Sequence, residues 1–191
     1  MTATNELDSY DKFVEGLKTN YPKSFRNVYC GISISEGWFH IIDNLCANIY
    51  SHVKWKRDVR SRDLLHNRAV SRGRDAVERY VTKGKAAPTM YDENRIDQIM
   101  DKGLIEVTPL VRHIEVHQIK EKFGGLSFYY EGGDERVSGM VRMAECWAAY
   151  TCEVCGERGT RRSGGWIRTL CDKHEAEHQQ RRSEECAEYD D

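Results

Sequence analysis

The chain has 191 residues, of which 39% are hydrophobic and 31% are charged, and this composition is typical of a globular protein with one modest core. No apolar run approaches the roughly 18 residues that a membrane-spanning helix needs. The polar, acidic residues 1–11 also lack the apolar stretch of a secretory signal. These features predict a cytoplasmic protein with no membrane partner.

The formal net charge of −2 conceals an uneven distribution. Residues 54–85 contain 11 Lys or Arg and 4 Asp or Glu, a local balance of +7. Such a stretch can attract nucleic acid, although its interspersed acidic residues also fit a solvated helix. Residues 181–191 form an acidic tail with little to bury, and we predict that it is disordered.

Apolar residues at helical spacing predict several helices in the first half of the chain. The first covers about 7–17 and ends at Tyr21-Pro22. The next follows a turn at 33–37, and its apolar stripe consists of Trp38, Ile41, Ile42, Leu45, Cys46 and Ile49. Weaker patterns over 76–81 and around 96–100 predict shorter helices, the latter closed by Gly103.

The pattern changes to strand over 104–123, where β-branched residues dominate. Gly124-Gly125 predicts a two-residue hairpin turn, because glycine takes positive φ at no steric cost. The return strand is expected to end at 131–133, and Asp134 can cap a helix that follows.

Together these elements predict an α+β fold, with a β-hairpin packed on amphipathic helices and a C-terminal zinc module that resembles a treble clef. Residues 1–150 would form the main domain, with a basic insertion at about 54–103. Residues 151–180 would form the zinc module, ahead of the acidic tail.

Three of the seven cysteines cluster near the C-terminus with a histidine. Two residues separate Cys152 from Cys155, and two separate Cys171 from His174. In a reducing compartment such pairs favour metal over disulfides, and each pair can hold one edge of a tetrahedron. Because protein groups fill all four positions, we expect a closed structural Zn²⁺ site rather than a catalytic one.

The segment from His174 to His178 also matches a metalloprotease pattern, with two histidines one helical turn apart and an intervening glutamate. His174 is already the fourth ligand of the cysteine cluster, however, and residues 172–182 offer no apolar face for burial. We therefore do not expect a zinc protease. His178 is expected to face solvent or to act as a substitute ligand.

A second arrangement of possible metal ligands lies on the predicted strand. His113, Glu115 and His117 alternate, so all three would point to one face. They could hold an open metal position that activates water, as in a metal-dependent hydrolase. The polar outer face of an ordinary strand has the same pattern, and the sequence favours a protein that is not an enzyme.

The predicted hairpin and the basic stretch contain the candidate ligand-binding residues. Lys120 and Lys122 place two cations beside the backbone amides of Gly124 and Gly125, where a phosphate or nucleotide could bind. A lysine-rich hairpin rim without a ligand is the alternative. In the basic stretch, Arg72 and Arg74 are the residues that we expect to contact nucleic acid.

Three segments resemble a group of small uncharacterised proteins encoded by phages, prophages and bacteria. The segments are GWFHIIDNLC at 37–46, QIKEKFGGLSFYY at 118–130, and TCEVCG at 151–156 combined with GWIRTLCDKH at 165–174. The resemblance covers roughly half of the chain, and residues 54–103 stand out from it as an insertion.

This resemblance implies a phage or mobile-element setting, and therefore a small protein in the host cytoplasm that could block host defence. The leading hypothesis is a non-enzymatic, zinc-stabilised protein that binds an anionic ligand, either nucleic acid or a nucleotide. The alternatives are an inhibitor that binds directly to a host defence protein, and the hydrolase described above.

Overall fold

The structure is a computed structural model that describes residues 8–28, 30–83, 87–163 and 166–189, with side chains as far as Glu184. The chain divides into two compact units, one formed by Met1–Ser51 with Arg112–Asp191 and the other by His52–Val111. Helix α2 (Phe39–Ser71) contributes to both units. Among the described residues, no helix has the length and apolar character needed to cross a membrane.

The first unit combines a small sheet with helices, which confirms the α+β class. In chain order its other elements are α1 (Ser9–Asn20), β1 (Ile32–Ser33), the 3₁₀ turn η1 (Glu36–Trp38), β2 (Arg112–Lys122), β3 (Gly125–Gly133), α5 (Glu135–Ala148), β4 (Thr160–Arg162), β5 (Arg168–Leu170) and α6 (Asp172–Tyr189). The larger sheet has the order β1-β2-β3, with β1 parallel and β3 antiparallel to β2. Strands β4 and β5 form a separate antiparallel pair.

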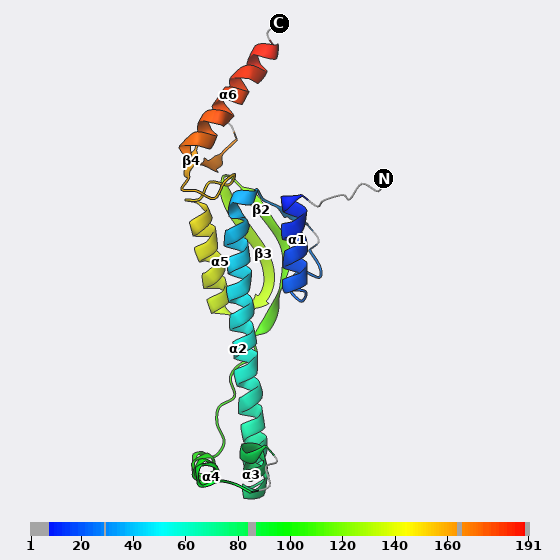
Figure 1. Cartoon of the computed structure of the whole chain (residues 1–191), viewed down its shortest axis with the longest axis vertical. Helices are drawn as coiled ribbons and strands as arrows, with labels where there is room; N and C mark the ends of the chain where they lie inside the picture. Colours follow the sequence, from blue (N-terminus) through cyan, green and yellow to red (C-terminus); the bar gives the residue numbers. More distant parts are fainter. Residues whose placement is uncertain (1–7, 29, 84–86, 164–165, 190–191) are drawn as a thin grey trace, which may run out of the picture. The chain divides into compact units, whose positions relative to one another are not determined.

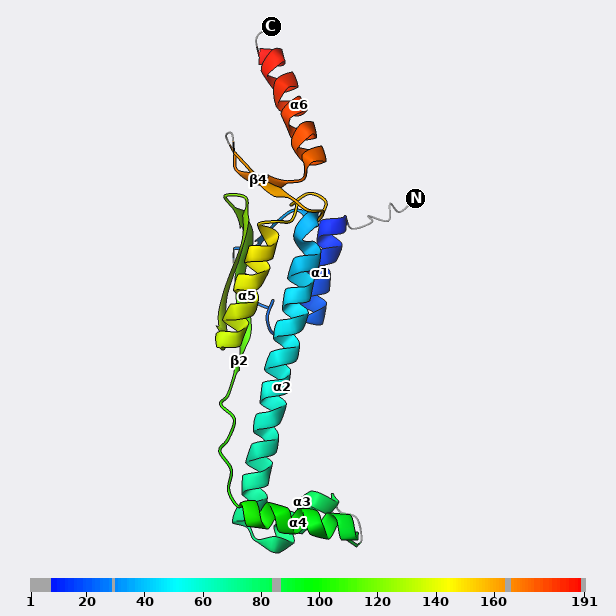
Figure 2. The same cartoon turned by 90° about the vertical axis from the view of Figure 1, so that its left-hand side faces the viewer.

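Helices α2 and α5 lie against one face of the larger sheet, and α1 lies beside the start of α2 (Figures 1 and 2). The predicted stripe of α2 is the centre of this core, with Trp38 and Ile42 fully buried. Val116 and Ile119 of β2 are fully buried as well. As predicted, Asp134 caps α5, since its carboxylate accepts a hydrogen bond from the backbone N–H of Val137.

The turn of the β2–β3 hairpin lies one residue earlier than predicted. Lys122 pairs with Gly125, so the two turn residues are Phe123 and Gly124, with φ of 52° and 73°. Positive φ at both positions is typical of a type I′ turn, which matches the twist of the flanking strands. As a consequence, the large ring of Phe123 stands at the tip of the hairpin and is 65% exposed.

The second unit consists of the later part of α2 with α3 (Arg74–Thr82) and α4 (Met90–Lys102). Its core contains Ala69, Val77 and Ile96, with Tyr80 and Ile99 packed around them. The two short helices were predicted, and α4 ends at Gly103 as expected. Residues 84–86, where the sequence predicts a break, lie outside the described residues.

The strand predicted from Leu104 is wrong for residues 104–111, because β2 begins only at Arg112. Polar side chains of α2 bond the backbone of this segment in place of a neighbouring strand. The Asn67 side chain exchanges two hydrogen bonds with the backbone of Ile105, and Asp63 accepts one from the N–H of Thr108. Both backbone groups of Ile105 and the N–H of Thr108 are therefore satisfied without a ladder.

Helix α6 continues to Tyr189 and thus covers most of the tail that the sequence predicts to be disordered. The structure describes side chains only as far as Glu184 in this helix. The order of the tail in solution stays a prediction.

Candidate metal centre and hairpin-tip surface

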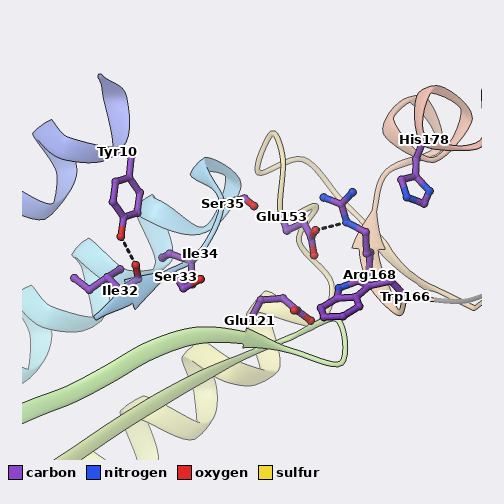
Figure 3. A pocket seen from close by; sticks show the side chains of 10 residues that line it. All are labelled: Tyr10, Ile32, Ser33, Ile34, Ser35, Glu121, Glu153, Trp166, Arg168 and His178. Carbon is purple, nitrogen blue, oxygen red and sulfur yellow. Dashed lines mark hydrogen bonds and ion pairs between the residues drawn. The ribbon is translucent and has the colours of Figure 1, made fainter. Parts of the chain in front are cut away.

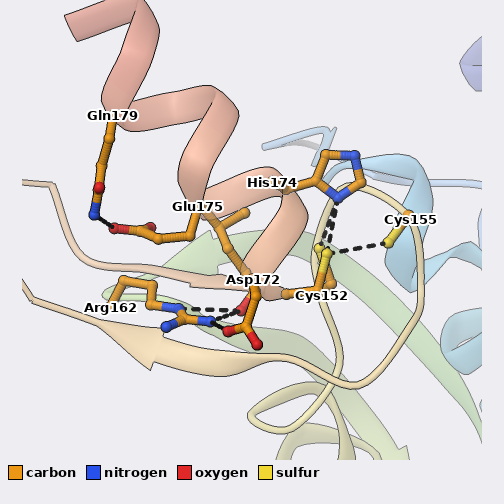
Figure 4. Close-up of polar contacts among 9 residues, drawn as sticks. Cys152, Cys155, Arg162, Asp172, His174, Glu175 and Gln179 are labelled. Carbon is orange, nitrogen blue, oxygen red and sulfur yellow. Dashed lines mark hydrogen bonds and ion pairs between the residues drawn. The ribbon is translucent and has the colours of Figure 1, made fainter. Parts of the chain in front are cut away.

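The four predicted metal ligands lie together at the junction of the knuckle 152–155 with the start of α6 (Figure 4). The ligand atoms of Cys152, Cys155, Cys171 and His174 all lie within 4.8 Å of one another. In the part of the chain that the structure describes, no other group of three or more His, Cys, Asp or Glu side chains converges in this way. The cluster can therefore hold a metal ion such as Zn²⁺.

The distances between these atoms fit tetrahedral coordination. Bonds of about 2.3 Å to sulfur and about 2.0–2.1 Å to nitrogen imply tetrahedron edges of about 3.8 Å between sulfurs and about 3.6 Å between sulfur and nitrogen. The Sγ atoms of Cys155 and Cys171 are 3.9 Å apart, and Cys152 Sγ is 3.5 Å from His174 Nδ1. The Cys171 Sγ–His174 Nδ1 distance of 3.1 Å is shorter than this ideal edge.

The pKa values of two cluster thiols shift in opposite directions. Burial raises the pKa of Cys152, but hydrogen bonds from the backbone N–H groups of Cys171, Cys155 and Val154 outweigh burial and lower this pKa to about 7. For Cys155, the backbone N–H of Glu157 lowers the pKa, yet burial and the neighbouring thiols outweigh that bond and raise it. Thiolates are the metal-binding form, so a thiolate at Cys152 favours metal binding near neutral pH.

The second ring nitrogen of His174 lies near a carboxylate. Nδ1 faces the sulfurs, while Nε2 lies 3.8 Å from Oε2 of Glu177, one turn further along α6. A carboxylate beside the outer nitrogen of a ligating histidine helps to orient the ring toward the metal.

The knuckle is anchored against η1, the 3₁₀ turn that precedes α2. The N–H of Gly37 donates to the carbonyl of Glu153, and Trp38 Nε1 donates to the carbonyl of Thr151. A Cβ at Gly37 would lie 2.1 Å from the carbonyl oxygen of Cys152, so only glycine permits this approach. The metal cluster is therefore joined to the core of the first unit.

Comparison with known proteins assigns this chain to no family. No protein-family model, curated protein or solved structure matches this chain. Its function must therefore be argued from its own residues.

The hairpin tip packs directly on the metal module. Thr169 of β5 donates from Oγ1 to the carbonyl oxygen of Gly124 at 2.6 Å, and both residues are in the first unit. A Cβ at Gly124 would lie 3.2 Å from Ile167 and from the backbone of Arg168. The turn and the strand thus form one continuous surface.

This surface contains both predicted lysines. A pocket of about 380 Å³ is lined by Lys120, Glu121, Lys122, Phe123, Trp166 and Ile167, which we call the hairpin-tip surface. The ring of Trp166 is 75% exposed, and the ammonium groups of Lys120 and Lys122 lie 5.3 Å and 5.8 Å from the rings of Tyr129 and Phe123. The surface therefore combines cationic side chains with exposed aromatic rings.

The predicted phosphate site at the backbone amides is not supported. The N–H of Gly124 already donates to Oε1 of Glu121 at 2.6 Å, so this amide is not available to a phosphate. Gly125 lies in β3, paired with Lys122. Of the four hairpin candidates, the two lysine side chains are the groups that stay available to an anion.

The candidates in the basic stretch lie in the second unit. Arg74 forms an ion pair with Asp97 at 2.6 Å, and this carboxylate raises the pKa of the guanidinium. Arg72 is exposed at the end of α2. Arg57 and Arg60 donate to the carbonyl oxygens of residues 111 and 108, so part of the positive charge has a structural role.

The triad of His113, Glu115 and His117 is not among the convergent ligand groups of the described residues. The predicted alternation holds, since Ile114 and Val116 are buried while His113, Glu115 and His117 are only partly buried. The β2–β3 register shifts between Arg112 and Glu115 and again between Val116 and Gln118. The carboxylate of Glu115 accepts hydrogen bonds from the Asn27 amide and the Arg26 guanidinium, which lower its pKa in that order. This geometry gives the hydrolase alternative no support.

Two residues that the sequence did not single out line a larger pocket of the first unit, together with His178 (Figure 3). Glu153 lies between two metal ligands and is only 4% exposed. Trp166 borders this pocket as well as the hairpin-tip surface. Glutamate is seldom buried unless it is paired, so no local pattern indicates that Glu153 is buried.

Proposed function

We propose that the chain is a zinc-stabilised binding protein, without a catalytic role, whose hairpin-tip surface binds single-stranded nucleic acid. The observation that carries this proposal is the single pocket that unites Lys120, Lys122, Phe123 and Trp166. Single strands are bound by cations that follow the phosphates and by aromatic rings on which bases stack. Both kinds of side chain line this one pocket.

Zinc is the metal that we assign to the cluster. Three thiolates and one imidazole are ligands that Zn²⁺ prefers, and four protein ligands close the site against substrate. The order of knuckle, β-hairpin and helix supports a treble-clef arrangement, with His174 on the first turn of α6. The role of the metal would be to hold β5 and Trp166 against the hairpin.

Fluorescence anisotropy with a labelled oligothymidine of about ten nucleotides tests the binding surface, since single-strand sites cover about 4–16 nucleotides. Lys122→Ala should lower the slope of log K against log salt by about 0.7, the value for one phosphate contact. Trp166→Ala should weaken binding by about 1–3 kcal/mol, the value of one stacked base.

Matched controls come from α5, where Arg142 and Trp147 are also exposed. Arg142→Ala and Trp147→Ala remove the same charge and the same ring type, and they should leave oligothymidine binding unchanged. Salt-independent binding, or equal losses in the α5 variants, would exclude the hairpin-tip surface as the binding site.

A protein target is the second candidate function, and a groove between α2 and α5 favours it. Ile41, Leu45, Met140, Met143, Ala144 and Trp147 supply its apolar lining. Met143 is 67% exposed and Trp147 is 54% exposed. Flexible methionine and tryptophan side chains are common where proteins bind partners. Either mode of binding is compatible with a phage protein that blocks a host defence enzyme in the cytoplasm.

A further inference from the structure

A pocket of the first unit with a volume of about 550 Å³ borders the hairpin-tip surface. Its polar lining includes Glu121, Glu153 and Arg168, and its aromatic lining includes Tyr10 and Trp166 (Figure 3). We call it the Glu153 pocket. Nothing in the proposed binding of phosphates and stacked bases at the hairpin tip uses these polar groups.

Glu153 has an incomplete set of hydrogen bonds. Its side chain is 6% exposed, and Oε1 accepts a hydrogen bond from Arg168 Nε at 2.5 Å. Oε2 is shielded from solvent and has no hydrogen-bond partner among the described residues. A buried carboxylate oxygen without a donor is costly, so the pocket is short of an N–H or O–H group at this point.

The carboxylate cannot easily turn away to find a donor in solvent. The backbone N–H of Glu153 donates to the carbonyl of Thr169, and its own carbonyl accepts from Gly37. The residue is thus fixed from both sides within the knuckle. Figure 3 shows its carboxylate directed at Arg168, with Glu121 and Trp166 close by.

Arg168 contributes hydrogen-bond donors to the same pocket, where Glu153 contributes an acceptor. Only its Nε contacts Glu153, and the terminal nitrogens of the guanidinium have no hydrogen-bond partner among the residues that the structure describes. A ligand that fits must therefore offer donors to the carboxylate and, next to them, an acceptor to the guanidinium. The exposed ring of Trp166 beside them favours a flat aromatic ligand.

Among the nucleobases, guanine has this arrangement. Its N1–H and 2-amino group are adjacent donors that a carboxylate can accept together, and O6 and N7 are acceptors that suit an arginine. Adenine and cytosine place an acceptor ring nitrogen next to their single amino group. Thymine places its one N–H between two carbonyls. In each of these three bases an acceptor would face the carboxylate.

The charge pattern of the two neighbouring pockets matches a whole nucleotide. Glu121 and Trp166 line both of them, so a base in the Glu153 pocket can be continuous with a phosphate at the hairpin tip. There Lys120 and Lys122 provide the positive charge. We propose that the Glu153 pocket receives a guanine base and selects guanine within the ligand that the hairpin tip holds, an inference that rests on the proposed function.

Competition binding with three probes tests this selection. The probes are an oligothymidine of about ten nucleotides, the same strand with one central guanine, and free guanosine monophosphate. The guanine strand should bind about tenfold tighter than oligothymidine or better, within the roughly 5- to 150-fold range of one bidentate base contact. Inosine, which lacks the 2-amino group, should lose most of this gain without any change in the protein.

Glu153→Gln tests the residue itself. The amide keeps the shape of the side chain but turns one acceptor into a donor, so the preference for guanine should disappear while oligothymidine affinity stays constant. Unchanged metal content and oligothymidine binding would establish that the variant is folded. A retained preference in this folded variant would overturn the assignment of Glu153.

The outcomes separate the two proposals. If oligothymidine does not bind at all, the proposed function fails. If oligothymidine binds in a salt-dependent way but guanine brings no gain, the function stands and the guanine pocket is overturned. Tight binding of free guanosine monophosphate would identify a nucleotide as the source of the base, whereas a gain only within the strand would identify nucleic acid.

Discussion

Replacement of Cys155 by serine separates the contribution of the metal from that of packing. Cys155 is exposed, so exchange of its sulfur for oxygen removes little buried surface. Structural zinc contributes about 10–16 kcal/mol of binding free energy in small zinc modules, which is as large as the stability of a whole domain. A thousandfold loss of zinc affinity would lower stability by about 4 kcal/mol when metal is in excess.

Native mass spectrometry and thermal melting with and without a chelator measure these effects. Parent protein should carry one zinc per chain and lose stability when chelated, and Cys155→Ser should melt like the chelated parent. Cys146→Ser is the matched control, because Cys146 is an exposed cysteine on α5 outside the cluster. A Cys155→Ser protein that retains its zinc and melts with the parent would refute the ligand assignment.

Two further predictions concern stability away from the metal. Gly37→Ala should lower the free energy of unfolding in urea by about 3 kcal/mol, because its Cβ would meet the Cys152 carbonyl at 2.1 Å. Gly139→Ala, in open space on α5, should instead raise this free energy by about 0.5–1 kcal/mol. Equal effects of the two substitutions would disprove the close contact. Hydrogen bonds from Thr108 lower the pKa of Asp63 in the folded protein. The ionised carboxylate therefore stabilises the second unit at pH values above its unfolded pKa of about 3.9. This contribution disappears as the pH falls through the lowered folded pKa. Amide exchange of Thr108 should therefore differ between parent and Asp63→Ala at neutral pH and converge in acid, and a difference that persists in acid would count against this bond.

The elements that the sequence predicted correctly are those whose pattern follows from local geometry. The stripe from Trp38 to Ile49 has helical spacing, and every residue in it is buried. Asp134 and Gly103 mark helix ends for stereochemical reasons that act within a few residues. The four metal ligands were predictable for the same reason, since spacing within each pair is enough to bring two ligands to one edge.

The predictions that failed depended on tertiary contacts and on strand register, which composition does not show. Residues 104–111 have strand composition, but Asn67 and Asp63 of α2 satisfy their backbone, and no local signal indicates this. The hairpin turn shifted by one residue because the pairing of Lys122 with Gly125 fixes the register, so Phe123 rather than Gly125 takes positive φ. Composition alone would place two glycines there.

Under the proposed function, a closed metal site determines binding without contacting the ligand, because it fixes the residues between its own ligands. Glu153 lies between the two ligands of the knuckle, and Trp166 and Arg168 lie between the knuckle and Cys171. These three residues of the Glu153 pocket are therefore bracketed in sequence by metal ligands. Thr169 transmits this constraint to the hairpin through its bond to Gly124. Loss of the metal would free all three bracketed side chains at once, so the metal acts on binding by fixing where these groups stand.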